Sequence, residues 1–182
     1  VMNYGVETLH APMAGAFNGA DPADVYIRSL KHALTGKTAK YSIQAHAFNR
    51  DGEASGRLVG GNLALLAHSC GTASDIRTRG RILFLEDVGE YVYNVDRMMY
   101  QLKRSGKLKN LAGLIVGGFT DMKDTERTFG RTAEEVIGDI VAEYDYPVCF
   151  EFPVSHAQPN FALKVGARYQ LHVGEKVVLQ EL

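Results

Sequence analysis

Glu86 and His156 are the residues whose types and settings best suit catalysis in this chain. Glu86 follows the apolar run from Ile82 to Leu85, and His156 follows an apolar segment that ends at Phe152. If the two segments are neighbouring strands of one sheet, the carboxylate and the imidazole emerge at the same edge, where α/β proteins commonly place their chemistry. A carboxylate that accepts from one ring nitrogen fixes the histidine tautomer and stabilises the imidazolium formed during proton transfer. The pair therefore indicates general acid–base chemistry.

Such a pair needs a hydroxyl or thiol nucleophile, and the sequence offers no good one. Ser155 adjoins His156, but adjacent side chains of an extended segment point in opposite directions. Ser69 and Cys70 end a short apolar segment that lacks the sharp Gly-x-Ser-x-Gly turn of an exposed nucleophile. The competing interpretations are a structural histidine at position 156 and a solvated acidic turn after the strand that carries Glu86.

Gly60, Gly61 and Asn62 form a second candidate site. They precede a predicted helix, and backbone amides at such a position can bind an anion such as a carboxylate. These three residues are therefore candidates for substrate binding. A tight turn followed by a helix N-cap is the simpler explanation of the same residues.

Cofactor and metal sites are not predicted. Gly117 and Gly118 follow a strand, but they lack the spacing and the lysine of nucleotide-binding loops. The carboxylates of Asp87, Glu90 and Asp96 have no histidine at ligand spacing, so solvated side chains explain them better than a metal site.

The order of the predicted elements indicates an α/β fold. Residues 82–85 and 111–116 are apolar runs typical of strands covered on both faces, and each precedes a segment with helical spacing. Residues 41–48 alternate with period two, and with 53–59 they predict a hairpin. Residues 167–179 predict a closing hairpin. Alternating strands and helices between antiparallel pairs imply a mixed set of sheets.

Several helix starts can be read from capping residues. Each carries a side chain that can accept a hydrogen bond from the first turn, and one is part of a complete capping box. The predicted N-caps are Asp21 (followed by Pro22), Asn62, Asn94 and Thr132, the last with Glu135 three residues later.

The composition is that of an ordinary globular domain and excludes several partners. The 182 residues are 46% hydrophobic and carry a formal net charge of -1, so a nucleic-acid partner is not expected. No apolar run is long enough to span a bilayer and no signal peptide is visible, so a membrane partner is not expected either. Cys70 and Cys149 show no metal-ligand spacing and suit free thiols in a reducing compartment.

Four motifs, followed by an apolar strand and a histidine, resemble one family. They are Gly60-Gly-Asn-Leu63, Arg81-Ile-Leu-Phe-Leu-Glu-Asp-Val-Gly-Glu90, Tyr93-x-x-Asp-Arg-Met-Met99 and Gly113-Leu-Ile-Val-Gly-Gly-Phe119. In this order they resemble the LD-carboxypeptidases, serine peptidases that include muramoyltetrapeptide carboxypeptidase and the microcin-immunity peptidases. The resemblance covers residues 5–182.

The resemblance implies a fold and a division of labour. The C-terminal domain of these enzymes is a swivelling-type, three-layer β/β/α domain with mixed sheets. It supplies a glutamate and a histidine, which match Glu86 and His156, while a preceding domain supplies a serine at a Gly-x-Ser-Asp elbow. That elbow is not in this sequence. We therefore expect residues 1–13 to be a remnant of the nucleophile domain and residues 14–182 to form the C-terminal domain.

The resemblance also implies an activity. The family removes the terminal D-alanine from murein tetrapeptide during cytoplasmic peptidoglycan recycling, without a metal or cofactor. This chain alone is expected to be inactive because it lacks the serine. Its expected partners are a murein peptide, its own N-terminal domain and a second copy in a homodimer. Two alternatives stay open: a microcin-immunity-type peptidase that cleaves a peptidyl-nucleotide, and a non-catalytic binding or dimerisation module.

Overall fold

The computed structural model of the chain describes residues 5–18, 21, 24–156 and 158–182. The helices among these residues are too short or too polar to cross a bilayer. The elements in chain order are β1 (Thr8–His10), η1 (Ala14–Phe17), α1 (Val25–Leu34), β2 (Lys40–Gln44), β3 (Gly52–Asn62), α2 (Leu63–Ser69), β4 (Ile82–Val88), α3 (Val92–Arg104), β5 (Gly113–Thr120), α4 (Ala133–Val141), β6 (Val148–Cys149), β7 (Leu163–Val165), β8 (Arg168–Val173) and β9 (Lys176–Glu181).

One long strand joins two kinds of sheet. The main sheet has the order β2-β9-β8-β3-β4-β5-β6. The first half of β3, from Gly52 to Arg57, pairs antiparallel with β8, and its second half, from Leu58 to Asn62, pairs parallel with β4. Because β3 belongs to both pairings, an antiparallel part (β2, β9, β8) continues directly into a parallel part (β4, β5, β6).

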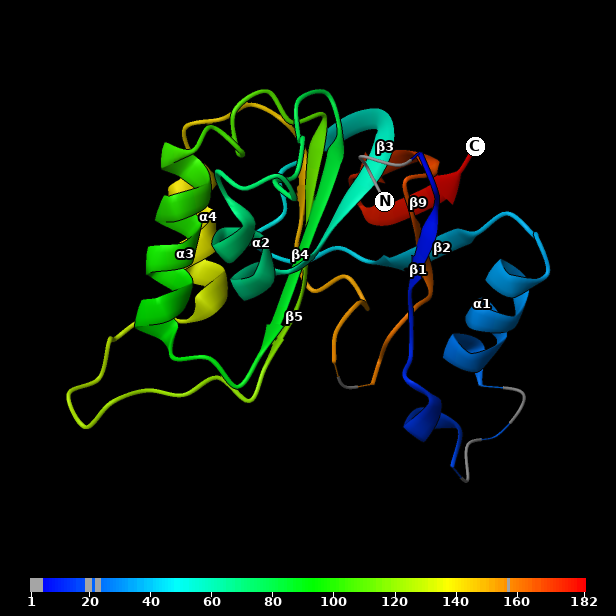
Figure 1. Cartoon of the computed structure of the whole chain (residues 1–182), viewed down its shortest axis with the longest axis horizontal. Coiled ribbons are helices and arrows are strands. Elements are labelled where there is room, and N and C mark those ends of the chain that lie inside the picture. Colours follow the sequence, from blue (N-terminus) through cyan, green and yellow to red (C-terminus); the bar gives the residue numbers. More distant parts are fainter. Residues whose placement is uncertain (1–4, 19–20, 22–23, 157) are drawn as a thin grey trace.

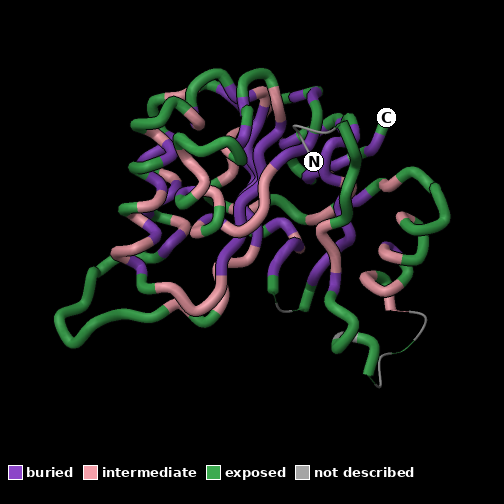
Figure 2. Tube along the Cα trace, viewed as in Figure 1, coloured by how far each residue is buried: buried purple, intermediate pink, exposed green. Residues whose placement is uncertain are grey.

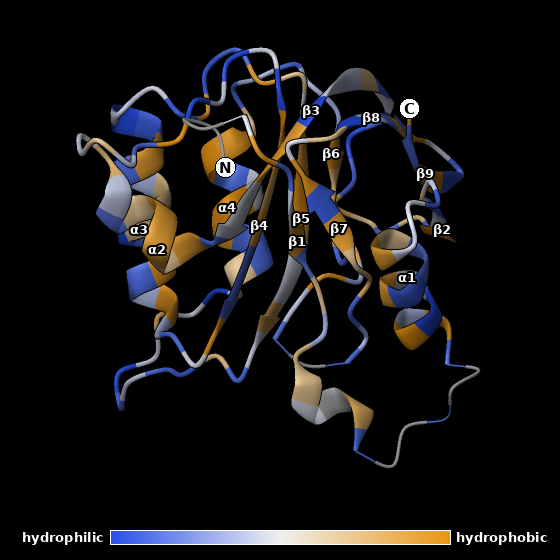
Figure 3. Ribbon diagram, turned by 45° about the vertical axis from the view of Figure 1, so that its right-hand side comes forward, coloured by the Kyte–Doolittle hydropathy of each residue, from blue (hydrophilic) through white to orange (hydrophobic). Residues whose placement is uncertain are grey.

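Two hydrophobic cores separate three layers. One core lies between the parallel strands and helices α2, α3 and α4, which Figure 1 shows together on one side of β4 and β5. The other core lies between the parallel strands and the antiparallel part. The parallel strands are therefore buried on both faces (Figure 2), and hydrophobic residues are concentrated in them and in the helices beside them (Figure 3). This arrangement confirms the predicted three-layer β/β/α fold.

A short ribbon ties the start of the described chain to its last third. Strand β1 pairs antiparallel with β7, and His10 lies opposite Leu163. Residues 8–10 thus pair directly with the domain. The predicted boundary after residue 13 stays a prediction, and residues 1–4 lie outside the described part of the chain.

The predicted hairpin of residues 41–48 and 53–59 is wrong, although both segments contain strands. Strand β2 pairs with β9, and β3 pairs with β8 and β4. Between them, Arg50 forms an isolated bridge with Val148 at the far edge of the parallel part. The two strands therefore pair with distant segments instead of with each other. The alternation of side chains along one segment does not reveal which segment it pairs with. The closing hairpin of β8 and β9 is confirmed.

The capping predictions have mixed outcomes. Thr132 forms the predicted capping box with Glu135 at the start of α4. Helix α1 starts later than predicted, because Asp24 rather than Asp21 accepts hydrogen bonds from the first turn; Pro22 lies outside the described residues. Asn94 is not the N-cap of α3, since Tyr91 holds that position; Asn94 lies in the first turn and donates to Glu90.

Candidate active site

The adjacent carboxylates of Glu86 and Asp87 lie on opposite faces of strand β4. Side chains alternate along a strand, so Glu86 shares a face with Phe84 while Asp87 shares a face with Leu85. Phe84 belongs to the core under the antiparallel part, and Leu85 belongs to the core under the helices. Both carboxylates are almost completely buried. Two acidic residues that are neighbours in sequence therefore serve two separate environments.

Asp87 fixes the start of helix α2. Its carboxylate accepts hydrogen bonds from Asn62 Nδ2 at 2.7 Å and from the backbone N–H of Ala64 at 3.0 Å. Asn62 Oδ1 in turn accepts from the N–H of Leu65 at 3.1 Å, so the predicted N-cap is confirmed. Asp87 is thus a buried structural residue, and the prediction that it is a solvated carboxylate is wrong.

Replacing Asn62 by alanine is expected to lower the free energy of unfolding by about 1–2 kcal/mol, because the helix loses its cap and Asp87 loses a donor. Urea unfolding followed by circular dichroism measures the change. The control is Thr35→Ala at the end of α1, where the hydroxyl lies on the exposed surface. An Asn62→Ala midpoint equal to that of the control contradicts the capping role.

Glu86 and His156 are in direct contact. His156 Nδ1 lies 2.5 Å from Glu86 Oε2. The glutamate side chain is completely buried, while 43% of the histidine side chain is exposed. Among the described residues, no partner approaches His156 Nε2, and Glu86 Oε1 has no hydrogen-bond donor. The carboxylate thus holds one ring nitrogen and leaves the other open toward the surface.

The surroundings of Glu86 set its proton affinity. Burial raises the pKa of the Glu86 carboxyl above its ordinary value, and the hydrogen bond and charge of His156 oppose that rise; neighbouring Asp87 adds a smaller upward shift. The net direction is upward. A buried carboxylate is costly to keep charged, and the neighbouring imidazole offsets part of that cost.

Two glycines of β5 let the His156 loop reach Glu86. Strand β5 lies between β4 and β6, so the chain after β6 must pass over β5. The backbone N–H of Phe152 donates to Val116 O at 3.1 Å, and that of Gly118 donates to Val154 O at 2.9 Å. A Cβ atom on Gly117 would lie 2.2 Å from Val154 O. The glycine pair, which showed no nucleotide-binding pattern, therefore has a positional role.

No nucleophile reaches His156 within the part of the chain that the structure describes. Ser155 is buried, and its Cβ lies 2.7 Å from where a Cβ on Gly118 would stand, so it faces β5 while its neighbour faces Glu86. The Ser69 hydroxyl donates to Leu66 O in helix α2, which covers the opposite face of the sheet. The absence of a nucleophile from this chain stays a prediction.

Gly60 and Gly61 lie at the end of β3, beside Phe84. Gly60 has a φ of +141°, and a Cβ there would lie 1.9 Å from Phe84 O, so the close pairing of β3 with β4 requires glycine. Nothing lies within 4 Å of the corresponding point at Gly61. The structure thus gives Gly60 and Asn62 structural roles; the predicted contact of these residues with substrate stays a prediction.

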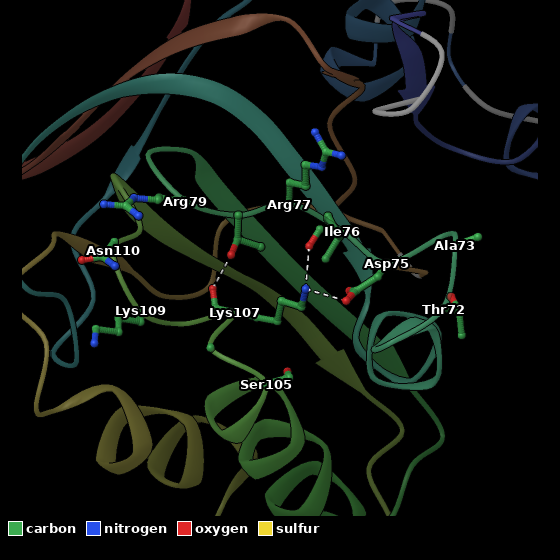
Figure 4. Close-up of a pocket in the computed structure, with 12 residues that line it drawn as sticks. Thr72, Ala73, Asp75, Ile76, Arg77, Arg79, Ser105, Lys107, Lys109 and Asn110 are labelled. Carbon is green, nitrogen blue, oxygen red and sulfur yellow. Dashed lines mark hydrogen bonds and ion pairs between the residues drawn. The ribbon is translucent and has the colours of Figure 1, made fainter.

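The pocket in Figure 4 lies away from this site. It has a volume of about 580 Å³ and is bordered by residues 72–79 and 105–110. Lys107 Nζ crosses its wall, 2.7 Å from Asp75 and 3.0 Å from Ile76 O. These segments precede β4 and β5, so the pocket lies at the amino-terminal ends of these strands, whereas Glu86 lies near the carboxyl end of β4. In the described ranges, no three His, Cys, Asp or Glu side chains are grouped so as to hold a metal ion.

His10 is a neighbour of this site that sequence reasoning missed. Its ring packs edge-on against Phe84, with ring centroids 5.1 Å apart. The proximity depends on the pairing of β1 with β7, which joins residues about 150 positions apart. No local pattern around His10 indicates such a contact, so the sequence carried no usable signal for it.

Comparisons with known proteins agree with the fold. The LD-carboxypeptidase C-terminal domain family matches residues 55–171, more than half of the chain. The probable murein peptide carboxypeptidase of Bacillus subtilis is 35% identical, over 98% of this chain and 57% of that protein. The murein tetrapeptide carboxypeptidase of Pseudomonas aeruginosa is 29% identical, over 90% of this chain and 55% of that protein.

Solved structures extend the comparison. The crystal structure of muramoyltetrapeptide carboxypeptidase from Oxalobacter formigenes superposes with a TM-score of 0.88 at 28% identity, over 99% of this chain and 62% of that one. The microcin C7 self-immunity protein MccF superposes with a TM-score of 0.81 at 21% identity and so shares the fold. The chain spans little more than half the length of the curated relatives it matches. By sequence and by fold, this chain belongs to the LD-carboxypeptidase C-terminal domain family.

Proposed function

We propose that this chain supplies the acid–base pair of a serine LD-carboxypeptidase that removes the terminal D-alanine from murein tetrapeptide. The observation that carries the proposal is the contact of His156 Nδ1 with buried Glu86, which leaves Nε2 open. The relatives named as murein peptide and murein tetrapeptide carboxypeptidases point to the substrate. The nucleophilic serine comes from the part of the relatives' length that this chain does not span.

The proposed reaction is acyl transfer in two steps. His156 Nε2 accepts the serine proton as the serine oxygen bonds to the carbonyl carbon that precedes D-alanine. The imidazolium then protonates the leaving amine as the C–N bond breaks, which releases D-alanine. A water molecule, deprotonated by the same ring, attacks the acyl-enzyme and restores the serine. Glu86 holds the ring tautomer and balances the positive charge in both steps.

The remaining parts of the proposal concern binding and context. Gly60, Gly61 and Asn62 lie at the end of β3, next to the strand that carries Glu86, and the open space at Gly61 leaves room for a substrate backbone. Residues 1–13 belong with the nucleophile domain, which packs against this domain beside His156. We further propose that the enzyme acts in the cytoplasm, in peptidoglycan recycling, and that it forms a homodimer.

A peptidyl-nucleotide substrate has weaker support. Structures of MccF contain aspartyl sulfamoyl adenosine and related compounds, but those proteins are about 21% identical to this chain, a likeness that shows the fold alone. No residue in the described part of the chain independently favours a nucleotide. The murein peptide is therefore the preferred substrate.

The test compares this chain with a completed enzyme, in which the missing length of the Bacillus subtilis relative is joined before it. Murein tetrapeptide is incubated with each protein, and free D-alanine is measured. We expect release by the completed enzyme and none by the chain alone. Release by the chain alone would mean that the chain contains its own nucleophile. The variants Ser155→Ala and Ser69→Ala would then show which serine acts as that nucleophile. A folded completed enzyme that cleaves only an aspartyl-nucleotide analogue contradicts the murein substrate.

A further inference from the structure

We propose that His10 is a second imidazole of the site, whose ring nitrogens hydrogen-bond the peptide bound against His156. The inference deepens the proposed function and rests on it for the identity of the ligand. Its structural part, the coupling of the two rings, is tested separately in this chain.

The first observation is where His10 points. Of the three residues of β1, only His10 is partly buried, while Thr8 and Leu9 are exposed. Its ring meets Phe84 edge-on at an interplanar angle of 70°. Phe84 precedes Glu86 by two residues, so both side chains leave β4 on the same face. His10 therefore lies over the face of the sheet from which Glu86 reaches His156.

The second observation is that the His10 ring nitrogens are unused. Within the described residues, no hydrogen bond or ion pair satisfies either of them, although the ring itself is well packed. A neutral imidazole carries one donor and one acceptor nitrogen. The His10 ring is half-buried and held in place by aromatic packing, and its nitrogens are available for hydrogen bonds. These two properties suit a group that binds a ligand.

The third observation is the charge environment. Burial lowers the pKa of His10 below its ordinary value of 6.5, and the positive charge of His156 lowers it further. The other titratable groups on the elements packed here are occupied elsewhere. Glu86 holds His156, Asp87 faces α2, and Lys164 of β7 pairs outside the site. Both carboxylates of β4 therefore have other partners, and the lowered pKa of His10 favours its neutral ring.

A neutral neighbour suits the proposed chemistry. If His10 were charged while His156 accepted a proton, two adjacent cations would share one buried carboxylate, which Coulomb repulsion disfavours. A neutral His10 can instead hydrogen-bond a peptide N–H or carbonyl without competing for Glu86. The site then holds a single mobile proton, on the ring that Glu86 orients.

The coupling is tested in this chain by NMR titration of the histidine side chains. We expect His10 to titrate below pH 6.5, and His156→Ala to raise the pKa of His10 without bringing it to 6.5, because burial remains. His32→Ala on α1 is the control and should leave His10 unchanged. A His10 that titrates at or above 6.5, or that ignores His156→Ala, overturns the proposal whatever the enzyme's activity.

The ligand contact is tested by kinetics in the completed enzyme. His10→Phe keeps an aromatic ring against Phe84 but removes both nitrogens, and we expect kcat/KM to fall roughly 10-fold to 100-fold, the effect of one lost hydrogen bond. His10→Gln, which restores a donor and an acceptor, should recover part of the loss. Equal kcat/KM in His10→Phe and the parent overturns the contact with peptide. If His10→Phe and His10→Gln lose activity equally, with unchanged unfolding midpoints, hydrogen bonding is not the cause.

Discussion

Glu86→Gln in the completed enzyme is expected to lower kcat by about 10⁴-fold, because glutamine fits the buried position but cannot balance an imidazolium or hold the same tautomer. KM should change little, since the side chain is completely buried and cannot touch the peptide. Release of D-alanine from murein tetrapeptide under single-turnover and steady-state conditions measures both constants.

The fold should survive this substitution. The pKa of Glu86 is raised in the folded chain, so its favourable contribution to stability is present below its ordinary value of 4.5 and is lost as pH rises through the folded pKa. At pH 7.5 an uncharged glutamine therefore costs no stability through this linkage. An unfolding midpoint well below that of the parent would mean that activity was lost through unfolding.

The chain contains a matched control pair. His172 and Glu53 also form a histidine–glutamate contact, at 3.3 Å, but both side chains are more than half exposed. Glu53→Gln should leave kcat unchanged. If Glu86→Gln keeps near-parental kcat, or if Glu53→Gln matches its loss, the assignment of Glu86 to the reaction is wrong.

Gly117→Ala is expected to have the second-largest effect. Its added methyl group would lie 2.2 Å from Val154 O, 2.6 Å from Val154 Cγ1 and 3.2 Å from Leu85 O, so the loop or the strand must move. Overpacking of this kind costs about 1–3 kcal/mol of stability. A displacement of His156 of about 1 Å should lower kcat/KM by a further factor on the order of 10².

Gly138→Ala provides the comparison. Gly138 lies inside helix α4, and a Cβ there would make an ordinary 3.8 Å contact with Phe150. This substitution should raise the free energy of unfolding by about 0.5–1 kcal/mol with unchanged kcat/KM. Urea unfolding and D-alanine release distinguish the two variants. A Gly117→Ala protein with parental stability and activity would show that the loop does not depend on the close approach.

Much of the sheet could be predicted because its central strands carry local signals. The apolar run before Glu86 predicted a strand covered on both faces, and β4 is such a strand. The geometric expectation that Glu86 and His156 emerge together came from both following apolar strands, and the two side chains are in contact. The expectation that the two strands are neighbours is wrong, because β5 lies between β4 and β6. The contact therefore also requires the chain after β6 to cross β5 at Gly117 and Gly118, which strand–helix alternation does not predict.

The features that sequence reasoning missed depend on pairing over long separations. The partner of β2 is β9, and β1 pairs with β7, so neither the alternation in residues 41–48 nor the context of His10 identified its neighbours. The burial of Asp87 was missed for a related reason, because its partners Asn62 and Ala64 belong to another strand and helix. Propensity describes one segment, whereas these contacts depend on two.

The alternation in β4 has an evolutionary consequence. A one-residue slip of this strand would turn both carboxylates to the opposite face, so Glu86 would leave His156 and Asp87 would leave the start of α2. Point substitutions within the strand can be repaired one at a time, but a single-codon insertion or deletion there would remove the acid–base pair and the helix cap together. We therefore expect length variation among functional descendants of this chain to fall in the surface loops and to spare β4.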